Sequence, residues 1–440
     1  MRKLFVCFGL LLVCSAAYAL DRQPVADYHT RREALAKKAG GVVVLLAPLE
    51  PMDSVYEFRQ ENNFYYLSGV IVPGAGLLIA PAADAQGDVP ARAYTEILFL
   101  PPRNLRLEKY TGRQMGAEDA EAPKLTGFDR VEEMGKLPEE VAKLLANQRP
   151  TVYTEMATQG NTPPSEDLVG FLRHSNAMVF FQDVKPMLTS LRTVKDAGEI
   201  ALIQKAVDAS AAAHLAAMKA VKPNVKEYEI SALMQYEWVR RGCERPSYAP
   251  IVGSGHNSTV LHYSEDTNTM NNGDVVVIDA AAEYSMYAAD ITRTLPVNGH
   301  FTARQKEIYD IVLGAQEAAI AAFQSGKSTL VGDSENSLNK IARDYIKSHG
   351  KDLHGQPLDQ YFIHGLGHYI GLHVHDDGDY KVPLGPGMAF TIEPGIYIPE
   401  ENIGVRIEDD FMVDAGGKLI KMSAAVPSKA DDVEKAMAGK

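Results

Sequence analysis

The segment "DVVVIDAAAEYSMYAADITRT", residues 274–294, places two aspartates in an apolar setting. Asp279 ends a run of four apolar residues, a pattern that is typical of a buried strand. Asp290 begins a second strand-like run, and the residues between the two are able to turn the chain into a hairpin. A buried carboxylate is costly unless it is paired, protonated or bound to a metal ion. The segment therefore predicts two strands whose carboxylates, Asp279 and Asp290, are paired, protonated or bound to a metal ion.

Two later segments have the same character. "MAFTIEPGIYI", residues 388–398, places Glu393 in a strand just before a Pro-Gly turn. "IGVRIEDDFMV", residues 403–413, alternates so that Glu408 lies on the face opposite Ile407. Any one of these carboxylates is compatible with a strand end in water or a pair with an arginine. Four of them together with a histidine cluster favour a metal site.

The histidine cluster is "HGLGHYIGLHVHD", residues 364–376. His364 and His368 have the spacing of a zinc-binding helix, in which two histidines four apart hold one ion. The residues between them include two glycines and no glutamate, which disfavours a helix and removes the usual general base. The sequence therefore predicts an extended or looped segment, in which the two rings do not face a common ion.

The chain is long enough for more than one domain, and its character changes near residue 185. Residues 20–184 mix apolar runs such as "GVVVLLA" and "TEILFL" with polar stretches, which predicts an α/β domain. Residues 185–424 go twice through a pair of helices followed by strands, which predicts pseudo-symmetric α/β halves. Three capping pairs are expected at the starts of these helices: Thr193 with Asp196, Asn224 with Glu227, and Thr302 with Gln305.

The two ends of the chain are expected to lie outside these domains. Residues 1–19 have a basic start, an apolar run and a small-residue cleavage site, which predicts a secretory signal peptide. Its removal takes away Arg2 and Lys3, so the formal charge moves from −13 to −15, and it leaves Cys243 as the one cysteine. Such an acidic chain argues against a nucleic-acid partner. Residues 425–440 are expected to form a disordered tail.

Five segments together resemble the motifs of the pita-bread metallopeptidases, and among them those of the Xaa-Pro aminopeptidases. Their order matches over nearly the whole chain after residue 19, and "EFRQENNFYYLSGV" (57–70) resembles a signature of that family's N-terminal domain. The resemblance implies a pita-bread catalytic domain over residues 185–424, preceded by a smaller α/β domain of the creatinase/prolidase type. The matching segments are "SGHNSTVLHYSED", "VVVIDAAAEYSMYAADITRTLPVNG", "HGLGHYIGLHVHD", "TIEPGIYI" and "GVRIEDD".

The resemblance also implies a site for two divalent metal ions. Four oxygen ligands and one imidazole suit manganese, with zinc, cobalt or iron as alternatives. Asp290 and Glu408 would bridge the two ions. The five implied ligands are Asp279, Asp290, His368, Glu393 and Glu408.

Further residues are assigned roles by the same resemblance. Glu393 would accept a proton from the attacking water, and His364 and His375 would steady the substrate carbonyl and the tetrahedral intermediate. His262 would bind substrate on the other side of the cleft and assist the leaving imino group. Without the motif context, each of these histidines would be assigned a structural or surface role. Tyr397 and Arg406 are weaker candidates for substrate binding. His256 and His373 stand where relatives carry acidic residues, and we expect them at the surface or rim.

The function implied is hydrolysis of the N-terminal residue from peptides with proline in second position, by attack of a metal-bound hydroxide on the scissile carbonyl. A prolidase, which cleaves only Xaa-Pro dipeptides, is the alternative. A second alternative is a non-catalytic pita-bread protein that uses the cleft for binding, and the intact ligand set disfavours it. We expect an exported protein, periplasmic or secreted, that forms a dimer or tetramer and has no membrane partner after cleavage.

Overall fold

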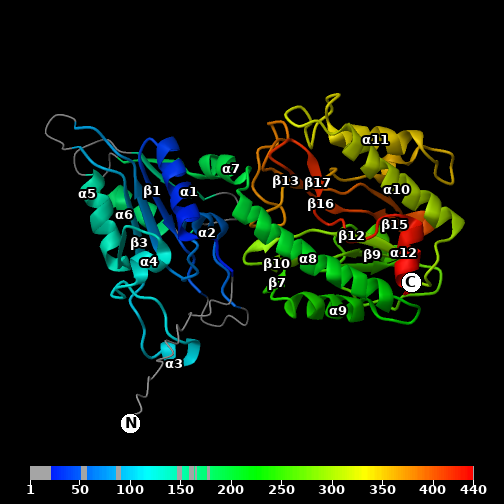
Figure 1. The fold of residues 1–440 in the computed structure, drawn as a ribbon, viewed down its shortest axis with the longest axis horizontal. Coiled ribbons are helices and arrows are strands. Elements are labelled where there is room, and N and C mark those ends of the chain that lie inside the picture. The colour runs from blue at the N-terminus through cyan, green and yellow to red at the C-terminus, as the bar shows by residue number, and fades with distance from the viewer. Residues whose placement is uncertain are drawn as a thin grey trace, which may run out of the picture.

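The computed structural model describes residues 21–50, 57–85, 91–145, 151–157, 163, 166–175 and 179–439. The predicted signal peptide therefore lies outside the described residues. Figure 1 shows two α/β regions side by side, with α7 (Lys185–Arg192) between them. In the described part of the chain, no helix is both long and apolar enough to cross a membrane. The mixed α/β class expected from the sequence is confirmed.

The first region is a sheet covered on both faces. Its strand order is β4-β3-β2-β1-β5-β6, with β2 antiparallel to both of its neighbours and the outer pairs parallel. The strands are β1 (Val42–Leu46), β2 (Gly76–Ala80), β3 (Thr95–Leu100), β4 (Arg130–Glu133), β5 (Thr151–Thr154) and β6 (Phe180–Asp183). Its helical segments are α1 (Val25–Lys38), α2 (Asn62–Ser68), α3 (Glu108–Thr111), α4 (Ala122–Thr126), η1 (Met134–Lys136), α5 (Leu137–Leu145) and α6 (Glu166–Ser175).

The alternation of β1 explains why helices cover both faces of this sheet. Val43 packs in the apolar core that contains α1 and α2, whereas its neighbour Val44 packs in a second core with α5 and α6. Successive strand residues point to opposite faces, so a continuous apolar run needs cover on both sides. Figure 1 shows α1 and α2 on one face and α5 and α6 on the other.

The second region contains the two predicted rounds of helices and strands. The first round has α8 (Ala197–Ala220), α9 (Glu227–Val239), β7 (Arg245–Pro246), β8 (Ile251–Ser254), η2 (Gly255–Thr259), β9 (Val275–Asp279), β10 (Ala282–Tyr284), β11 (Tyr287–Ala288) and β12 (Thr292–Pro296). The second round has α10 (Ala303–Ala322), α11 (Leu338–Ser348), η3 (Leu358–Tyr361), β13 (Ala389–Ile392), β14 (Gly395–Ile398), η4 (Pro399–Glu401), β15 (Ile403–Arg406), β16 (Asp409–Val413), β17 (Leu419–Lys421) and α12 (Ala430–Met437). The two helix pairs flank the strands in Figure 1.

The strands of the two rounds meet at one seam. The first round forms the sheet β12-β9-β8, and the second forms β13-β16-β17 together with the pair β14-β15. A bridge between Thr292 and Glu408 joins the two rounds at this seam. The pseudo-twofold arrangement of helix-strand halves is thereby confirmed.

Helix α8 is fixed to its strands by one buried histidine. The Nε2 atom of His214 lies 3.0 Å from the carbonyl oxygens of both Ala280 and Ile291. Burial lowers the pKa of His214 to about 4, so the ring is neutral and its Nε2–H is shared by the two carbonyls. These carbonyls belong to the residues directly after Asp279 and Asp290.

Helix α10 makes the corresponding contact in the second round. Gln316 donates its Nε2–H groups to the carbonyl oxygens of Ile392 at 2.9 Å and Ile407 at 3.3 Å. These carbonyls belong to the residues directly before Glu393 and Glu408. Each round therefore uses a buried polar side chain of its first helix to position the backbone beside its two carboxylates.

The observed helix starts differ from two of the three predicted capping pairs. Asp196 is itself the N-cap of α8 and forms a capping box with Glu199, so the predicted pair with Thr193 is wrong. At α9, Asn224 has a left-handed backbone and the helix begins only at Glu227, so that predicted cap is also wrong. The box of Thr302 and Gln305 at α10 is confirmed.

The prediction of a disordered tail over residues 425–440 is wrong for the described residues 425–439, which pack against the second region. This segment forms α12, and the side chain of Val433 is fully buried. Upstream of this helix, Arg293 donates to the carbonyl oxygen of Pro427 at 2.8 Å. The charged composition of the tail concealed the few apolar residues that attach it.

We predict that Gly404→Ala destabilises the protein, because a Cβ atom there would lie 1.8 Å from the carbonyl oxygen of Ser258. Overpacking of this kind costs about 1–3 kcal/mol, and it should lower the urea midpoint of unfolding. Gly135→Ala is the matched control, because a Cβ atom there meets nothing within 4 Å. Equal midpoints for the two variants would contradict the close packing of β15 on η2.

Candidate metal centre

Two of the candidate ligands come from the first round of strands. Asp279 is the last residue of β9 and pairs with Thr292 of β12. Between them, β10 and β11 form the predicted hairpin, in which Ser285 and Met286 both have positive φ, as a tight two-residue turn requires. This hairpin returns the chain so that Asp290 enters the seam beside Asp279. Both aspartates are buried.

The other two carboxylates come from the second round. Glu393 directly follows β13, and Glu408 lies between β15 and β16. Glu408 is 1% exposed, and its Oε2 accepts a hydrogen bond from the hydroxyl of Thr292 at 2.6 Å. Its other oxygen, Oε1, is buried and has no hydrogen-bond partner among the described residues. A buried carboxylate oxygen without a donor is a favourable ligand for a cation.

The segment that carries His368 is irregular rather than helical, as predicted. Gly367 permits its close approach to β13, since a Cβ atom there would lie 2.1 Å from the carbonyl oxygen of Thr391. Nδ1 of His368 lies 3.1 Å from the carbonyl oxygen of Tyr369, which orients Nε2 toward the carboxylates.

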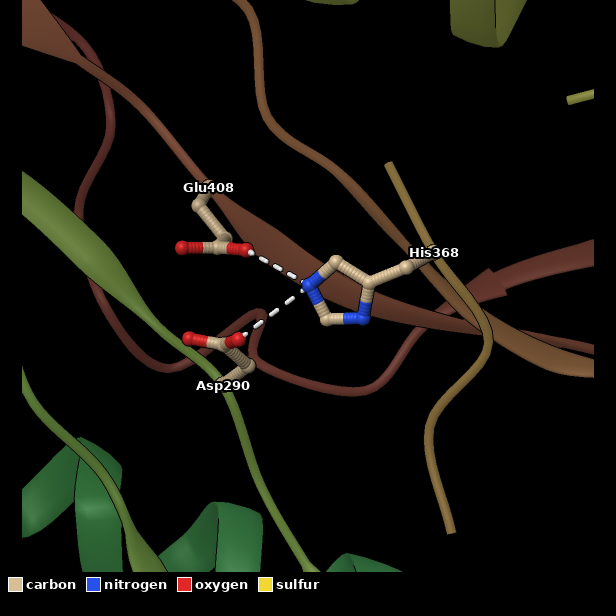
Figure 2. Close-up of side chains that lie close together, drawn as sticks. All are labelled: Asp290, His368 and Glu408. Atoms are coloured by element: carbon tan, nitrogen blue, oxygen red, sulfur yellow. Dashed lines mark ion pairs between the residues drawn. The ribbon is translucent and has the colours of Figure 1, made fainter. Parts of the chain in front are cut away.

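Nε2 of His368 is the point at which the carboxylates converge. It lies 3.3 Å from Glu393, 3.4 Å from Asp290 and 4.0 Å from Glu408, and Figure 2 shows the ring pointing between the latter two. One ligand atom from each of Asp290, His368 and Glu408 fits within 4.8 Å of the others, a spacing that could hold a metal ion.

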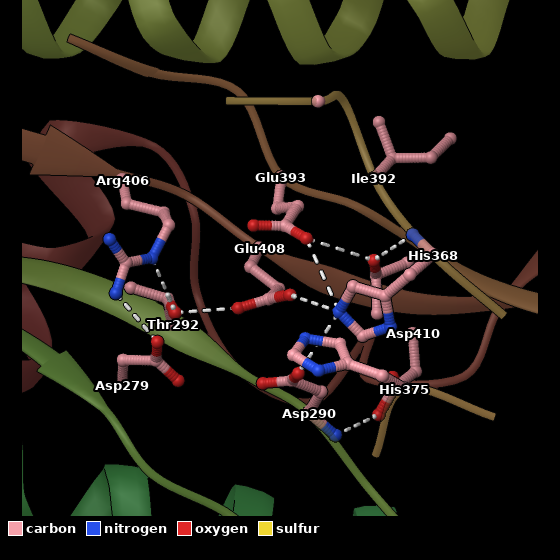
Figure 3. A network of polar contacts seen from close by, with 12 residues as sticks. Asp279, Asp290, Thr292, His368, His375, Ile392, Glu393, Arg406, Glu408 and Asp410 are labelled. Carbon is pink, nitrogen blue, oxygen red and sulfur yellow. Dashed lines mark hydrogen bonds and ion pairs between the residues drawn. The ribbon is translucent and has the colours of Figure 1, made fainter. Parts of the chain in front are cut away.

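The fourth carboxylate, Asp279, is tied to this group by Tyr248. The hydroxyl of Tyr248 lies 2.6 Å from one oxygen of Asp279 and 2.6 Å from one oxygen of Asp290. Sequence reasoning did not identify Tyr248, because a tyrosine in the loop between β7 and β8 carries no spacing signal. Figure 3 shows the five candidate ligands gathered within one network. Their role as ligands stays a prediction.

The cluster holds more negative charge than its cations neutralise. Burial, and then the charge of Asp279, raises the pKa of Asp290 to about 6. Burial, and then Asp290, raises the pKa of Glu408 well above its ordinary value. Burial would lower the pKa of His368, but its contacts with Asp290 and Glu393 outweigh this and raise it. Four carboxylates, one imidazole and an unpartnered buried oxygen fit divalent cations that prefer oxygen ligands.

Arg406, Tyr397 and His364 form a chain along one side of the cluster. Arg406 donates from Nη2 to Asp279 at 2.6 Å and from Nη1 to the hydroxyl of Tyr397 at 2.8 Å. Because an arginine only donates, this hydroxyl gives its own proton to Nε2 of His364, 2.8 Å away. His364 then carries its ring proton on Nδ1, which lies 2.8 Å from the carbonyl oxygen of Gly365.

His375 and His262 are placed differently from His364. Both line a cavity of about 270 Å³ over the cluster and an adjoining cavity of about 390 Å³. The ring of His375 stands edge-on to that of His368, with centroids 4.3 Å apart. Burial, and then the nearby His368, lowers the pKa of His375, so its ring is neutral at pH 7. No described residue hydrogen-bonds to its ring nitrogens, which leaves an N–H for a bound molecule.

The two histidines without an assigned role lie at the surface. His373 is exposed and lines the larger of the two cavities, close to His375. His256 is exposed and its Nδ1 lies 3.1 Å from Oδ1 of Asn402.

The chain is similar to known proteins along nearly its full length. The description "Metallopeptidase family M24" matches residues 201–415, and "Aminopeptidase P, N-terminal domain" matches residues 28–153. The chain is 37% identical to the Xaa-Pro aminopeptidase of Haemophilus influenzae, over 95% of this chain and 98% of that protein. It is 34% identical to the Xaa-Pro aminopeptidase of Escherichia coli, over 93% and 97%.

Solved structures give the same result. Aminopeptidase P from Escherichia coli with the inhibitor Pro-Leu superposes with a TM-score of 0.83 at 31% identity, covering 95% of this chain and 99% of that one. A structure described as a putative aminopeptidase P from Bacillus anthracis superposes with a TM-score of 0.84 at 28% identity, covering 95% and 99%. These matches confirm the expected pita-bread region with its preceding α/β region.

We predict that metal binding weakens as the pH falls below about 6, because an ion must then displace a proton from Asp290. Each displaced proton lowers the affinity about tenfold per pH unit. Equilibrium dialysis followed by elemental analysis, between neutral pH and about pH 5, measures this. In the metal-free protein Asp290 binds more protons in the native state than in the unfolded state between about pH 4 and 6. The contribution of Asp290 to stability therefore falls as the pH rises through this window.

The variant Glu408→Gln tests whether Glu408 is a metal ligand. It should bind less metal at neutral pH, and chelation should shift its unfolding temperature less than that of the parent. Glu400→Gln is the control, since Glu400 is an exposed carboxylate on η4. Unchanged metal content in the Glu408 variant would remove this carboxylate from the candidate ligands.

Proposed function

The chain belongs to the Xaa-Pro aminopeptidases of metallopeptidase family M24 and is a hydrolase, and from this premise we propose that it uses two metal ions to release the residue before a proline. The observation that carries the proposal is the convergence of four carboxylates and His368 beneath a cavity that His375 also lines. The candidate ligands are Asp279, Asp290, His368, Glu393 and Glu408. The alternative of a non-catalytic binding protein is set aside, because the family is one of hydrolases.

The proposed ligands are suited to two cations side by side. When bound, such ions would lower the pKa of a water molecule and polarise the scissile carbonyl. Ligand atoms of Asp290, His368 and Glu408 lie within 4.8 Å of one another, so these residues would hold a cation, and we propose that Asp290 and Glu408 would be shared with a second one. Oxygen ligands predominate, so we propose manganese, with zinc, cobalt or iron as alternatives.

Glu393 is proposed as the proton acceptor. Its side chain is partly exposed to the cavity, with one oxygen 3.3 Å from Nε2 of His368 and 3.3 Å from the hydroxyl of Thr391. The contact with His368 lowers its pKa in spite of burial, so the group is an ionised base at neutral pH. A proton taken from the attacking water would pass from this carboxylate to the leaving nitrogen.

His375 is proposed to donate a hydrogen bond to the substrate carbonyl. Its neutral ring has an unoccupied N–H and lines the cavity over the cluster. Such a donor stabilises the negative charge that develops on the carbonyl oxygen in the tetrahedral intermediate. His364 has both ring nitrogens engaged, so we propose that it holds Tyr397 and Arg406 in place and contacts substrate only after its ring turns. His262 is exposed at the mouth of the cavity and would assist the leaving imino group.

The setting of the enzyme is also proposed. Residues 1–19 support export to the periplasm or the exterior, where an aminopeptidase of this kind would act on proline-containing peptides. We further propose a homo-oligomer, a dimer or a tetramer, for which light scattering on the purified protein is the direct measurement.

We predict that the enzyme cleaves both Xaa-Pro dipeptides and longer Xaa-Pro peptides, and that it does not cleave peptides with alanine in second position. The measurement is kcat/KM on a series of increasing length, with metal-stripped protein refilled by manganese, zinc or cobalt. Turnover of the dipeptide alone would establish the prolidase alternative. Absence of turnover on every Xaa-Pro peptide, with metal bound, would overturn the proposed function.

We predict that His375→Ala lowers kcat by about 10²–10³, the usual effect of removing one donor to a developing oxyanion. The metal content should stay that of the parent, because His375 is not among the proposed ligands. His300→Ala is the control, since the side chain of His300 is 81% exposed and pairs with Glu434. If kcat is unchanged in the His375 variant, another residue must supply the donor.

A further inference from the structure

The segment that carries His375 has little regular structure of its own. Residues 371–375 form bends, and 376–377 belong to no strand or helix. Asp376 N–H donates to the carbonyl oxygen of Tyr369 at 2.9 Å, Ala288 N–H to that of Gly371 at 2.8 Å, and Gly371 N–H to that of His373 at 3.2 Å. Within the segment, Nδ1 of His373 also lies 3.1 Å from the backbone nitrogen and oxygen of His375. The position of the His375 ring therefore depends on what holds the side chains and carbonyls around it.

Asp376, directly after His375, is held by two buried cations. Arg192 hydrogen-bonds one oxygen of Asp376, and Nζ of Lys195 lies 3.0 Å from the other. Arg192 is 2% exposed, Lys195 4% and Asp376 6%. Despite its burial, the pKa of Asp376 is lowered by these two cations, so the group is a carboxylate. Charge-assisted bonds in a buried setting are strong and geometrically specific.

Arg192 also holds two other groups. Its Nη1 donates to Oδ2 of Asp377 at 2.7 Å and to Oδ1 of Asn63 at 2.6 Å. Asn63 lies in α2, within the first region. One guanidinium thus joins α7, α2 and the segment that carries His375.

A second arginine of the first region holds the other end of the segment. Arg59 donates from Nη2 to the carbonyl oxygen of Leu372 at 2.6 Å. Its Nε lies 3.0 and 2.9 Å from the two oxygens of Glu283, which is in β10. Arg59 therefore contacts the segment at Leu372, three residues before His375, and Arg192 contacts it at Asp376 and Asp377, one and two residues after His375.

We propose that Arg59 and Arg192 are positioning residues for the hydrolysis, which fix residues 372–377 so that the His375 ring faces the candidate metal ligands. Both lie outside the stretch that matches the M24 family, so the first region and α7 complete a site whose reacting groups all belong to the second. The inference rests on the proposed role of His375. It gives the first region a part in the chemical step as well as any part in peptide access.

The test is a double-mutant cycle between Arg192→Gln and His375→Ala, measured as kcat and KM on an Xaa-Pro peptide. Misplacing a reacting group by about 1 Å costs up to a hundredfold, so Arg192→Gln should lower kcat by about ten- to a hundredfold, with a smaller change in KM and unchanged metal content. In the double variant, kcat should be no lower than in His375→Ala alone, because the arginine acts through that ring. Arg192→Lys, which keeps a cation beside Asp376, should recover part of the loss.

Arg31→Gln is the matched control. Arg31 is also a buried arginine, 5% exposed, and it joins α1 to Asp196 and Glu199 at the start of α8 without contacting residues 371–377. It should lower stability in the same way as Arg192→Gln but leave kcat unchanged. If Arg192→Gln does not fold, Arg59→Gln replaces it, because the side chain of Arg59 is 25% exposed and its loss is more easily tolerated.

Each outcome decides a separate point. A parent kcat in the folded Arg192→Gln or Arg59→Gln variant, or losses that add in the double variant, would overturn the positioning role. An equal fall in kcat for Arg31→Gln would also overturn it, since the effect would then be one of general destabilisation. Failure of the proposed function is recognised independently, because the parent enzyme itself would not hydrolyse the peptide.

Discussion

The constraint on which this structure depends is the convergence of four carboxylates, three of them buried and Glu393 partly exposed, at one seam between two sheets. Each lies beside a backbone carbonyl that a first-helix side chain holds, His214 of α8 in one round and Gln316 of α10 in the other. The carboxylates repel one another, as the raised pKa values of Asp290 and Glu408 reflect. The packed strands and these helix anchors, together with polar contacts such as those of Tyr248 and Arg406, keep them close, so the folded structure offsets the cost of bringing the charges together.

The arginine and lysine side chains near the seam leave the charge of Asp290 and Glu408 unneutralised. Arg406 pairs with Asp279, while Asp409, one residue after Glu408, is paired with both Arg293 and Lys421. Asp290 and Glu408 have no arginine or lysine partner among the described residues. Metal ions would neutralise Asp290 and Glu408, as arginine and lysine side chains neutralise Asp279 and Asp409.

The sequence predicted the strands of the seam, the hairpin between the aspartates and the irregular histidine segment, because apolar alternation and paired glycines are local signals. It could not predict Tyr248, which joins two carboxylates, or Arg192, which holds the segment of His375. Both act through contacts between residues far apart in the chain, and neither residue type has a spacing that reveals its partner. The tail was missed for a related reason, since its buried residues Val426, Ala430 and Val433 are few and stand among charged ones.

The three consecutive acidic residues of the "EDD" motif show how strand geometry assigns chemistry. Successive side chains of a strand alternate between faces, so Glu408 and Asp410 share one side and Asp409 takes the other. Asp409 accordingly faces Arg293, whereas Oδ2 of Asp410 accepts the backbone N–H of Asp290 at 3.0 Å. Burial, and then Asp290, raises the pKa of Asp410 well above its ordinary value, as it does for Glu408. What distinguishes the three is their contacts: Glu408 lies 4.0 Å from Nε2 of His368, Asp409 binds Arg293, and Asp410 holds the backbone of Asp290.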